Sequence, residues 1–251
     1  MEYINYILFF IIILSANIIQ GITGFAGTIL AMPFSLMLVG YEVAKPVLNV
    51  LGLLSGIYVF IGNKKHVEWQ EVKKIVVVMT VGICCGIWIK GGFEGKEQML
   101  YKVLGIFIII LAVSGFWTQI KKKLMDNEEN VKKHAPFVTY FFLPLAGIVH
   151  GIFVSGGPLL ISYLAKRIQE KISFRATIST VWIFLNSIIL ADDIRNGFWT
   201  LELIKIQLLS VPFLLGGMFI GGKLVKRMSQ KLFMNITYLL LLISGGSLLF
   251  K

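Results

Sequence analysis

Two glycine-rich stretches carry the residues best suited to bind a ligand. The first reads Q-G-I-T-G-F-A-G-T-I-L-A-M-P from Gln20 to Pro33, inside an apolar run over residues 3–39. That run is much longer than the ~20 residues of one membrane crossing, and each of its glycines lowers helix propensity by about 1 kcal/mol relative to alanine. We therefore predict a broken helix. In lipid such a break persists only where protein or a water-filled cavity surrounds its backbone groups. The candidate ligand-binding residues here are Gln20, Gly21, Thr23, Gly24, Phe25 and Gly27.

The second stretch reads H-G-I-F-V-S-G-G-P from His150 to Pro158, inside an apolar run over residues 137–164. Serine is a good helix cap and proline favours the first helical turn, so a new helix is expected to begin here. The start of a helix offers free N–H groups and a positive dipole end, which together bind anions. The alternative is that the glycines only allow close helix packing. The candidates here are His150, Gly151, Ser155, Gly156 and Gly157.

Polar residues also stand near the start of the helix that follows each broken segment. Lys45 and Arg175 are either guides for an anion entering from each side or side chains that snorkel to the membrane interface. One turn further in lie Asn49 and Ser179, with Thr180 next to the serine. Such side chains are either hydrogen-bonding contacts between helices or ligands for a substrate near the membrane midplane.

His150 is the only histidine inside an apolar run. It is either a carrier of a proton during transport or a hydrogen-bonded neutral imidazole. The only carboxylates within a run are Asp192 and Asp193 at its end, and we expect both at the outer surface. The adjacent Cys84 and Cys85 are expected to be small buried residues. We therefore predict no metal and no cofactor, with coupling to H⁺ or Na⁺ left open.

The composition indicates an integral membrane protein. Of the 251 residues, 57% are hydrophobic and only 15% are charged. The formal net charge is +11, and the basic residues lie in short loops between apolar runs. Cytoplasmic loops of membrane proteins carry an excess of lysine and arginine, so this charge fits a membrane protein. We therefore expect a lipid bilayer and no nucleic acid as partner. The N-terminus lacks the basic region of a signal peptide, so no cleavage is expected.

Sliding the chain against itself by 130 residues reveals an internal repeat. Without any gap this single offset pairs Ala16 with Ala146, Gly21 with Gly151, Gly27 with Gly157, Trp69 with Trp199 and Gly86 with Gly216. We predict an all-α polytopic membrane protein of two inverted repeats, each a glycine-broken re-entrant hairpin plus three transmembrane helices. The first repeat is 1–120 (hairpin 3–39, helices 46–61, 75–89 and 101–120), the basic cytoplasmic linker is 121–136, and the second repeat is 137–251 (hairpin 137–164, helices 174–191, 203–220 and 232–250).

The distribution of loop charge favours hairpins over crossings for the two broken segments. If each segment returns to the side from which it entered, most of the 24 lysines and arginines fall on one side of the membrane. That side is the cytoplasm by the positive-inside tendency. Three full crossings per half then invert the second half and place both termini outside the cytoplasm.

The motifs resemble the TauE/SafE sulfite exporter family of bacterial membrane permeases. The likeness rests on the broken first helix ending in A-x-P, on its second copy H-G-x-x-x-S-G-G-P, and on the duplicated four-segment halves. Phe25, Ala26 and Thr28 stand where members often have glycine, which narrows the pocket. By position the family motif carries over to Gly21, Gly24, Gly27 and Pro33, and to Gly151, Gly156, Gly157 and Pro158. The resemblance implies transport of small sulfur-containing or carboxylated anions, commonly outward across the bacterial plasma membrane.

We therefore expect a secondary transporter that exports anions such as sulfite, organosulfonates or sulfoacetate by alternating access, with the anion held at the hairpin tips. An anion channel remains the alternative among transport functions. A membrane-embedded enzyme using His150 and Ser155 is the alternative from another class, but the sequence offers no third group to orient the imidazole. Whether the protein is a monomer or a homodimer stays open.

Overall fold

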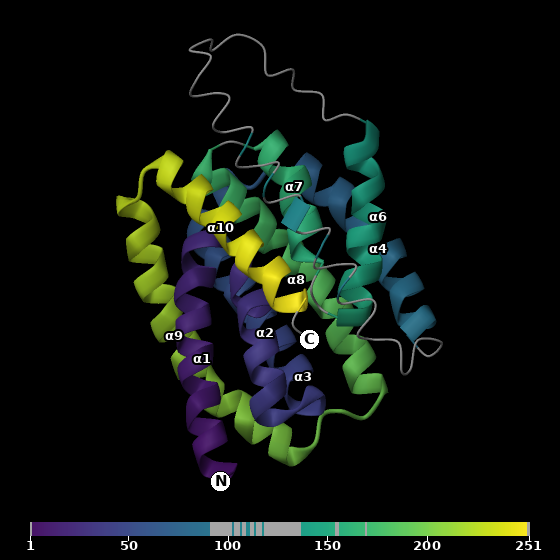
Figure 1. Cartoon of the computed structure of the whole chain (residues 1–251), viewed down its shortest axis with the longest axis vertical. Coiled ribbons are helices and arrows are strands. Elements are labelled where there is room, and N and C mark those ends of the chain that lie inside the picture. The colour runs from purple at the N-terminus through teal and green to yellow at the C-terminus, as the bar shows by residue number, and fades with distance from the viewer. Residues whose placement is uncertain are drawn as a thin grey trace.

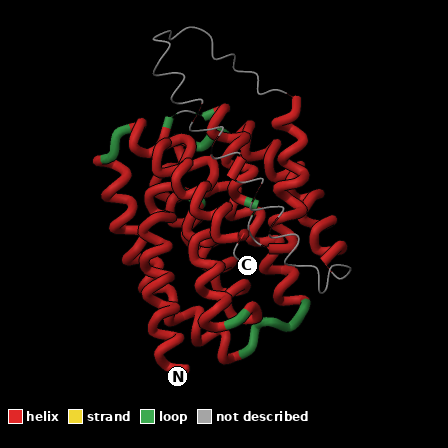
Figure 2. The backbone as a smooth tube through the Cα atoms, viewed as in Figure 1, coloured by secondary structure: helices red, strands yellow, loops and turns green. Residues whose placement is uncertain are grey.

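The computed structural model describes residues 2–90, 137–153, 156–168 and 170–249, together with isolated helical positions between 102 and 117. In these ranges the chain is helical, with short connections and no strand (Figure 2). The helices are α1 (Glu2–Thr23), α2 (Ala26–Val39), α3 (Tyr41–Asn63), the 3₁₀ turn η1 (Lys64–His66), α4 (Trp69–Lys90), α6 (Phe137–Phe153), α7 (Gly157–Arg167), α8 (Lys171–Arg195), α9 (Leu201–Arg227) and α10 (Gln230–Leu249) (Figure 1).

Five of the described helices are long and apolar enough to cross a bilayer. They correspond to α1, α3 together with η1, α4, α8 and α9 and have 20 to 27 residues each. At 1.5 Å per residue each is at least as long as the ~30 Å hydrocarbon core. By contrast α2 has 14 residues and α7 has 11, so neither reaches across alone. This is the architecture of an all-α polytopic membrane protein, as the composition predicts.

Most described helices extend beyond the apolar runs that predicted them. For example, α3 begins at Tyr41 and ends at Asn63, whereas the apolar run covers only 46–61. The reason is that polar residues near the ends, such as Lys45, still take helical geometry because the capping positions lie further out. The expected helix 101–120 and linker 121–136 fall almost wholly outside the described residues.

Both broken segments reverse direction at their glycines. Near the start of α2, a Cβ added to Gly27 would lie 2.7 Å from Ala16 O of α1. Just before α7, a Cβ added to Gly156 would lie 2.2 Å from Ala146 O of α6. Since each second helix starts directly against the helix that precedes it, the short α2 and α7 lie alongside α1 and α6.

Each first helix packs in parallel against a helix from the other half of the chain. A Cβ on Gly217 of α9 would lie 2.8 Å from Leu14 O of α1, and one on Gly221 would lie 2.2 Å from Ile18 O. On the other side of the molecule, Gly82 and Gly86 of α4 make the matching contacts with Pro144 O and Ile148 O of α6, at 2.3 and 2.4 Å. Small residues thus let these helix backbones touch.

These contacts correct the register of the predicted repeat. The residues of α1 and α6 correspond at an offset of 130, as Leu14 and Pro144 do, but the glycines of α4 and α9 correspond at 135. The expected partner of Gly86, Gly216, is not in tight contact, because its Cβ would be 3.7 Å from the nearest atom, Leu14 Cδ1. Gly86 and Gly216 match in sequence at the offset of 130, but only Gly86 makes a close backbone contact. The packing glycines of α4 and α9 therefore do not follow that offset, because the packing face of each helix is set by its partner.

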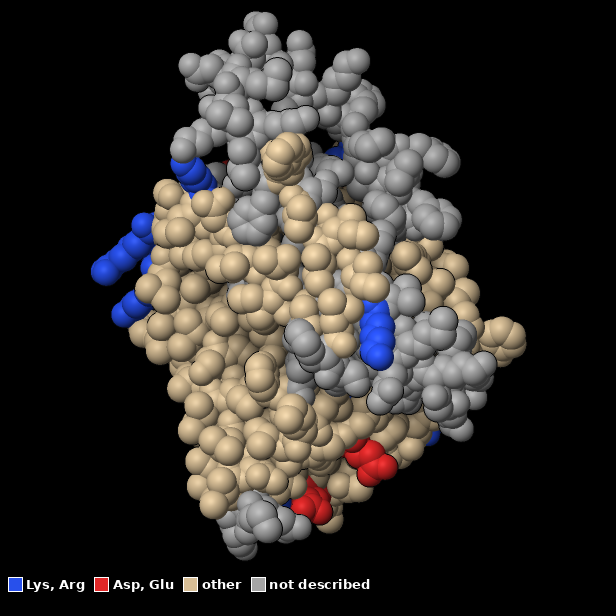
Figure 3. Space-filling view, viewed as in Figure 1, with Lys and Arg blue, Asp and Glu red and all other residues tan. Residues whose placement is uncertain are grey.

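The centre of the molecule is formed by α3 and α8, which run antiparallel. Lys45 near the start of α3 meets Asp193 near the end of α8, and Gly56 near the end of α3 meets Ser179. The end of the molecule with the start of α3 and the end of α8 also holds the N-terminus of α1 (Figure 1). Acidic side chains show at this lower end, while lysines and arginines gather mainly in the upper half (Figure 3).

Candidate functional site

The break between α1 and α2 is closed by side chains of α1. Gly24 has φ of +84°, a left-handed conformation that glycine adopts without steric cost. Thr23 Oγ1 accepts a bond from Ala26 N at 3.2 Å. Gln20 Oε1 accepts one from Gly27 N at 2.8 Å, and its Nε2 donates to Ser55 Oγ at 3.1 Å. The start of α2 is thus held by neutral oxygens inside the protein.

The break between α6 and α7 is built differently. Helix α7 begins at Gly157, with Gly156 as its N-cap and proline in its first turn, and no side chain caps it. Gly156 packs tightly against α6, since its Cβ would lie 2.8 Å from His150 Cβ. The predicted cap, Ser155, lies outside the described residues.

The starts of α2 and α7 meet each other. A Cβ on Gly157 would lie 2.6 Å from Ile29 Cδ1, one turn into α2, and 3.6 Å from Trp182 Cζ2 of α8. A small cavity opens at this junction, with about 20 Å³ accessible to the centre of a water-sized molecule, which is room for about one water. Its lining consists of Gln20, Phe25, Thr28, Ile29, Gly52, His150, Gly157, Trp182 and Asn186.

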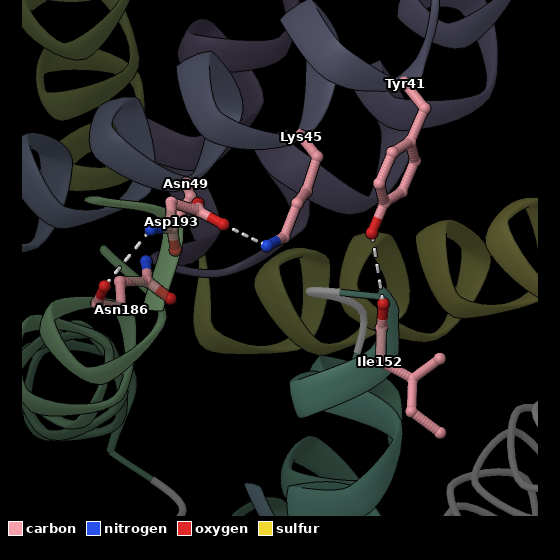
Figure 4. Close-up of polar contacts among 6 residues, drawn as sticks. All are labelled: Tyr41, Lys45, Asn49, Ile152, Asn186 and Asp193. Carbon is pink, nitrogen blue, oxygen red and sulfur yellow. Dashed lines mark hydrogen bonds and ion pairs between the residues drawn. The ribbon is translucent and has the colours of Figure 1, made fainter. Parts of the chain in front are cut away.

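A chain of amides connects this cavity to α3. His150 Nε2 lies 3.0 Å from Asn186 Oδ1. Asn49 Nδ2 donates to Asn186 O at 3.1 Å (Figure 4). The His150 ring also packs against Trp182, with centroids 5.1 Å apart. For three buried atoms of this group the described residues offer no hydrogen-bond partner: His150 Nδ1, Trp182 Nε1 and Asn49 Oδ1. Buried polar atoms without partners are rare in proteins, so this group is a candidate place for a bound water or a polar ligand.

Lys45 lies one turn from Asn49 and pairs with Asp193 (Figure 4). Both side chains are buried, at 1% and 0% exposure, and the ammonium also lies 5.6 Å from the centroid of the Phe198 ring. The expectation that both aspartates lie at the surface was therefore wrong for Asp193. A lysine inside a helical bundle needs a counter-charge, and α8 supplies it. In this conformation the ammonium is engaged by protein instead of facing an open vestibule.

Arg175, the repeat equivalent of Lys45, is also buried, at 5% exposure. No ion pair to this side chain is found among the described residues, and its buried Nε has no hydrogen-bond partner. The two predicted guiding cations therefore differ: Lys45 has a carboxylate partner, and Arg175 has none among the described residues.

The structure brings only part of the predicted set to the cavity. Gln20, Phe25, His150 and Gly157 line it, while Gly24, Gly27 and Gly156 form the breaks themselves. Gly21 packs against Gly221 and Gly151 against Ile83, so these two glycines serve helix packing. The hydroxyl groups form other contacts: Thr180 bonds to Ala176 O of its own helix, Thr23 to Ile19 O, and Ser179 reaches Gly24 O at 3.4 Å.

Four cavity residues were not predicted to bind a ligand: Thr28, Ile29, Gly52 and Trp182. A fifth, Asn186, was expected only as a weaker candidate of the same kind as Asn49 and Ser179. The repeat offers a signal for one pair, because Gly52 and Trp182 are equivalent at the offset of 130, as Gln20 and His150 are. Asn186 lies one turn from Trp182 on α8. Shifting each predicted residue by 130 positions does not lead to Gly52 or Trp182. Apolar and small residues are common throughout the chain, so the pairing of these two is a weak signal.

Comparison with known proteins identifies the family. The sequence model described as sulfite exporter TauE/SafE matches residues 8–248 of the chain. The chain belongs to the TauE/SafE family. This confirms the resemblance inferred from the glycine motifs. The chain is also similar to the probable inner membrane transporter protein TsaS of Comamonas testosteroni, with 23% identity over 188 residues that cover 74% of each chain. No solved structure matches it.

This TauE/SafE member is a multi-pass membrane transporter. Its family is one of transporters, and its helices are those of a polytopic membrane protein. In the described part of the chain no three His, Cys, Asp or Glu side chains come together as a metal site would require.

Proposed function

We propose that the protein exports small anions that carry a sulfite, sulfonate or carboxylate group, such as sulfite, organosulfonates or sulfoacetate. The family's printed description is that of a sulfite exporter, and the TsaS relative is an inner membrane transporter. The observation that carries the proposal is the junction of Gly157 with Ile29, where the starts of two helices meet at a cavity with unpartnered polar atoms. The start of α7, which no side chain caps, favours negative charge because the N–H groups and the dipole of a helix start attract anions.

Export proceeds by alternating access between two inverted halves. The contacts between α3 and α8 support this arrangement, because replacing each residue by its repeat equivalent turns one contact into another. Asn49 touches Asn186, and their equivalents Ser179 and Gly56 touch each other. Such reciprocal contacts are expected of two equivalent helices around a two-fold axis in the membrane plane. The cavity lies between these halves, so rocking them exposes it to each side in turn.

The cavity in this conformation holds about one water, which is smaller than any of these anions. A permanently open channel would instead need a continuous wide path. A cavity of this size favours a transporter that opens to one side at a time over a permanently open channel.

The orientation follows from charge. The end formed by η1, the start of α8 and the end of α9 is rich in lysine and arginine and faces the cytoplasm. The opposite end, with the start of α1, then lies outside the inner membrane. On this assignment Arg175 stands on the cytoplasmic side of the cavity, where its charge attracts anions that are to be exported.

Replacing Gly157 tests the role of the cavity. In proteoliposomes the wild-type protein should transport at least one of sulfite, thiosulfate, sulfoacetate, sulfate or a short carboxylate. We expect Gly157→Leu to abolish this flux, because its side chain would fill the space between Ile29 and Trp182. The matched control is Gly62→Leu, since a Cβ there meets no atom within 4 Å.

Both variants should insert and elute as the wild type does on size exclusion. Full flux through Gly157→Leu would show that the anion passes elsewhere. A wild-type protein that moves none of the five anions would overturn the proposed substrate class.

A further inference from the structure

The cavity has a property that is unusual for an anion site, because none of its lining residues carries a formal charge. The nine residues include no lysine, arginine, aspartate or glutamate. The nearest lysine of the amide chain, Lys45, is paired with Asp193, so its charge is largely cancelled. An anion that enters this cavity must therefore obtain its stabilisation from neutral donors or from a group that becomes charged.

His150 is the one titratable residue in the lining, and its hydrogen bond fixes which ring nitrogen bears hydrogen. The partner of Nε2 is Asn186 Oδ1 at 3.0 Å. An amide oxygen only accepts, so Nε2 must be the donor. In a neutral imidazole with hydrogen on Nε2, the other nitrogen, Nδ1, is a bare acceptor. This Nδ1 is buried and has no partner in the part of the chain that the structure describes.

A bare acceptor is unsuited to an anion, since two lone pairs would face each other without a hydrogen between them. Protonating Nδ1 changes this, because it creates both a donor and a positive charge beside the anion. Resting on the proposed export of anions, we infer that His150 binds one proton at Nδ1 together with each anion, and that proton and anion cross the membrane together. The proton enters from the side on which the anion is bound and leaves Nδ1 when the anion is released on the other side.

The surrounding elements offer little competition for this proton. The face of α4 against α6 consists of Met79, Gly82, Ile83 and Gly86, and none of them titrates. Helix α2 contains no titratable residue, and the cavity-facing turns of α1 and α7 contain none. On α3 the nearby groups are Tyr41, whose hydroxyl contacts Ile152 O, and Lys45 (Figure 4).

The remaining neighbour is Asp193 on α8, which pairs with the Lys45 ammonium. Bringing the anion into the cavity offsets the repulsion between that ammonium and a second cation at His150. Proton binding and anion binding therefore favour each other, which is a coupling between two ligands of one site.

The other half of the repeat suggests the variant that separates proton binding from folding. The position equivalent to His150 is Gln20, which is hydrogen-bonded through both ends of its amide. Glutamine is thus compatible with the turn of the hairpin. In His150→Gln the amide nitrogen can still donate to Asn186 Oδ1, but no group titrates.

Calorimetry on the purified full chain measures the proton directly. Binding of sulfoacetate or methanesulfonate, which are fully ionised near neutral pH, is measured in two buffers of different ionisation enthalpy. We expect the wild type to take up about one proton per anion and to lose up to about tenfold in affinity per unit rise in pH. His150→Gln should take up almost none and bind with a flat pH dependence. His66→Gln, which removes an exposed histidine outside the cavity, should behave as the wild type.

The outcomes separate the two proposals. Anion binding by the wild type without proton uptake, or equal uptake by His150→Gln, overturns the role of His150 while leaving anion transport in place. If the wild type binds neither anion nor any of the others, the proposed function falls and this inference falls with it. Even if His150→Gln does not fold, anion binding by the wild type without proton uptake overturns the inference.

Discussion

Gln20 and His150 occupy equivalent positions at the two hairpins, yet their hydrogen bonding differs. Gln20 is satisfied at both ends and closes the first break, whereas His150 leaves one ring nitrogen without a partner. The same contrast separates the cations: Lys45 is paired with Asp193, and Arg175 has no carboxylate partner in the described residues. Duplicated positions therefore supply the frame of the cavity, while the differences between the copies supply its chemistry.

The contrast between the two cations predicts the largest effect on stability. Removing the carboxylate in Asp193→Ala leaves Lys45 buried and uncompensated, which costs about 3–5 kcal/mol. The repeat equivalent of Asp193 is Asn63, whose amide donates to Val59 O of its own helix and to no other group in the described residues. Asn63→Ala should therefore lower the melting temperature in detergent far less than Asp193→Ala.

The double variant Lys45→Met with Asp193→Leu should recover most of the loss, because it removes both buried charges. Equal melting temperatures for Asp193→Ala and Asn63→Ala would mean that the buried pair contributes nothing to the fold.

The packing glycines give the next effect, and they test the shifted register of the repeat. Gly86→Ala and Gly221→Ala each push a methyl group into a backbone carbonyl, at 2.4 and 2.2 Å, and should cost about 1–3 kcal/mol. Gly216→Ala meets its nearest atom at 3.7 Å and should be close to neutral. Thermal unfolding of the three variants shows whether the packing glycines of α4 and α9 are related by 130 or by 135 residues. A costly Gly216→Ala beside a harmless Gly221→Ala would restore the register of 130.

The smallest effect concerns the helix starts. Glu170 caps α8 by accepting from Ile172 N and Ser173 N, at 2.9 and 2.6 Å, whereas its equivalent Gly40 provides no side-chain cap for α3. Burial acts to raise the pKa of Glu170, but these bonds outweigh it and the pKa lies below its usual value. A carboxylate with a lowered pKa stabilises the folded state above its unfolded pKa, and the gain is lost as pH falls through the folded pKa.

Glu170→Gln should thus lower stability by about 1 kcal/mol at pH 7 and by less at acidic pH. Melting temperatures at both pH values provide the measurement. Glu42→Gln is the control, since it removes an acid from the first turn of α3 without breaking a side-chain cap. A loss for Glu170→Gln that is the same at acidic and neutral pH would rule out a role for the ionised carboxylate.

The sequence was informative about the breaks because glycine and proline act locally. The positions at which α1 ends and α7 begins follow from Gly24, Gly156 and Gly157, whose effect on the backbone needs no distant partner. The family was likewise recognisable from these motifs. The sequence was less informative about roles, since Gly21 and Gly24 look alike in a chain of apolar residues, and only their neighbours make one a packing residue and the other a turn.

What the sequence determined by itself is a helical membrane protein of the TauE/SafE family with two interrupted helices, since hydrophobic length and helix-breaking residues are local properties. Only the tertiary structure decided that Asp193 neutralises Lys45, that α4 and α9 correspond at 135 residues, and that Trp182 and Asn186 join His150 at the cavity. These contacts join residues more than 30 positions apart. Which side chains meet at such a distance is set by how helices pack, and a pattern along one chain does not record it.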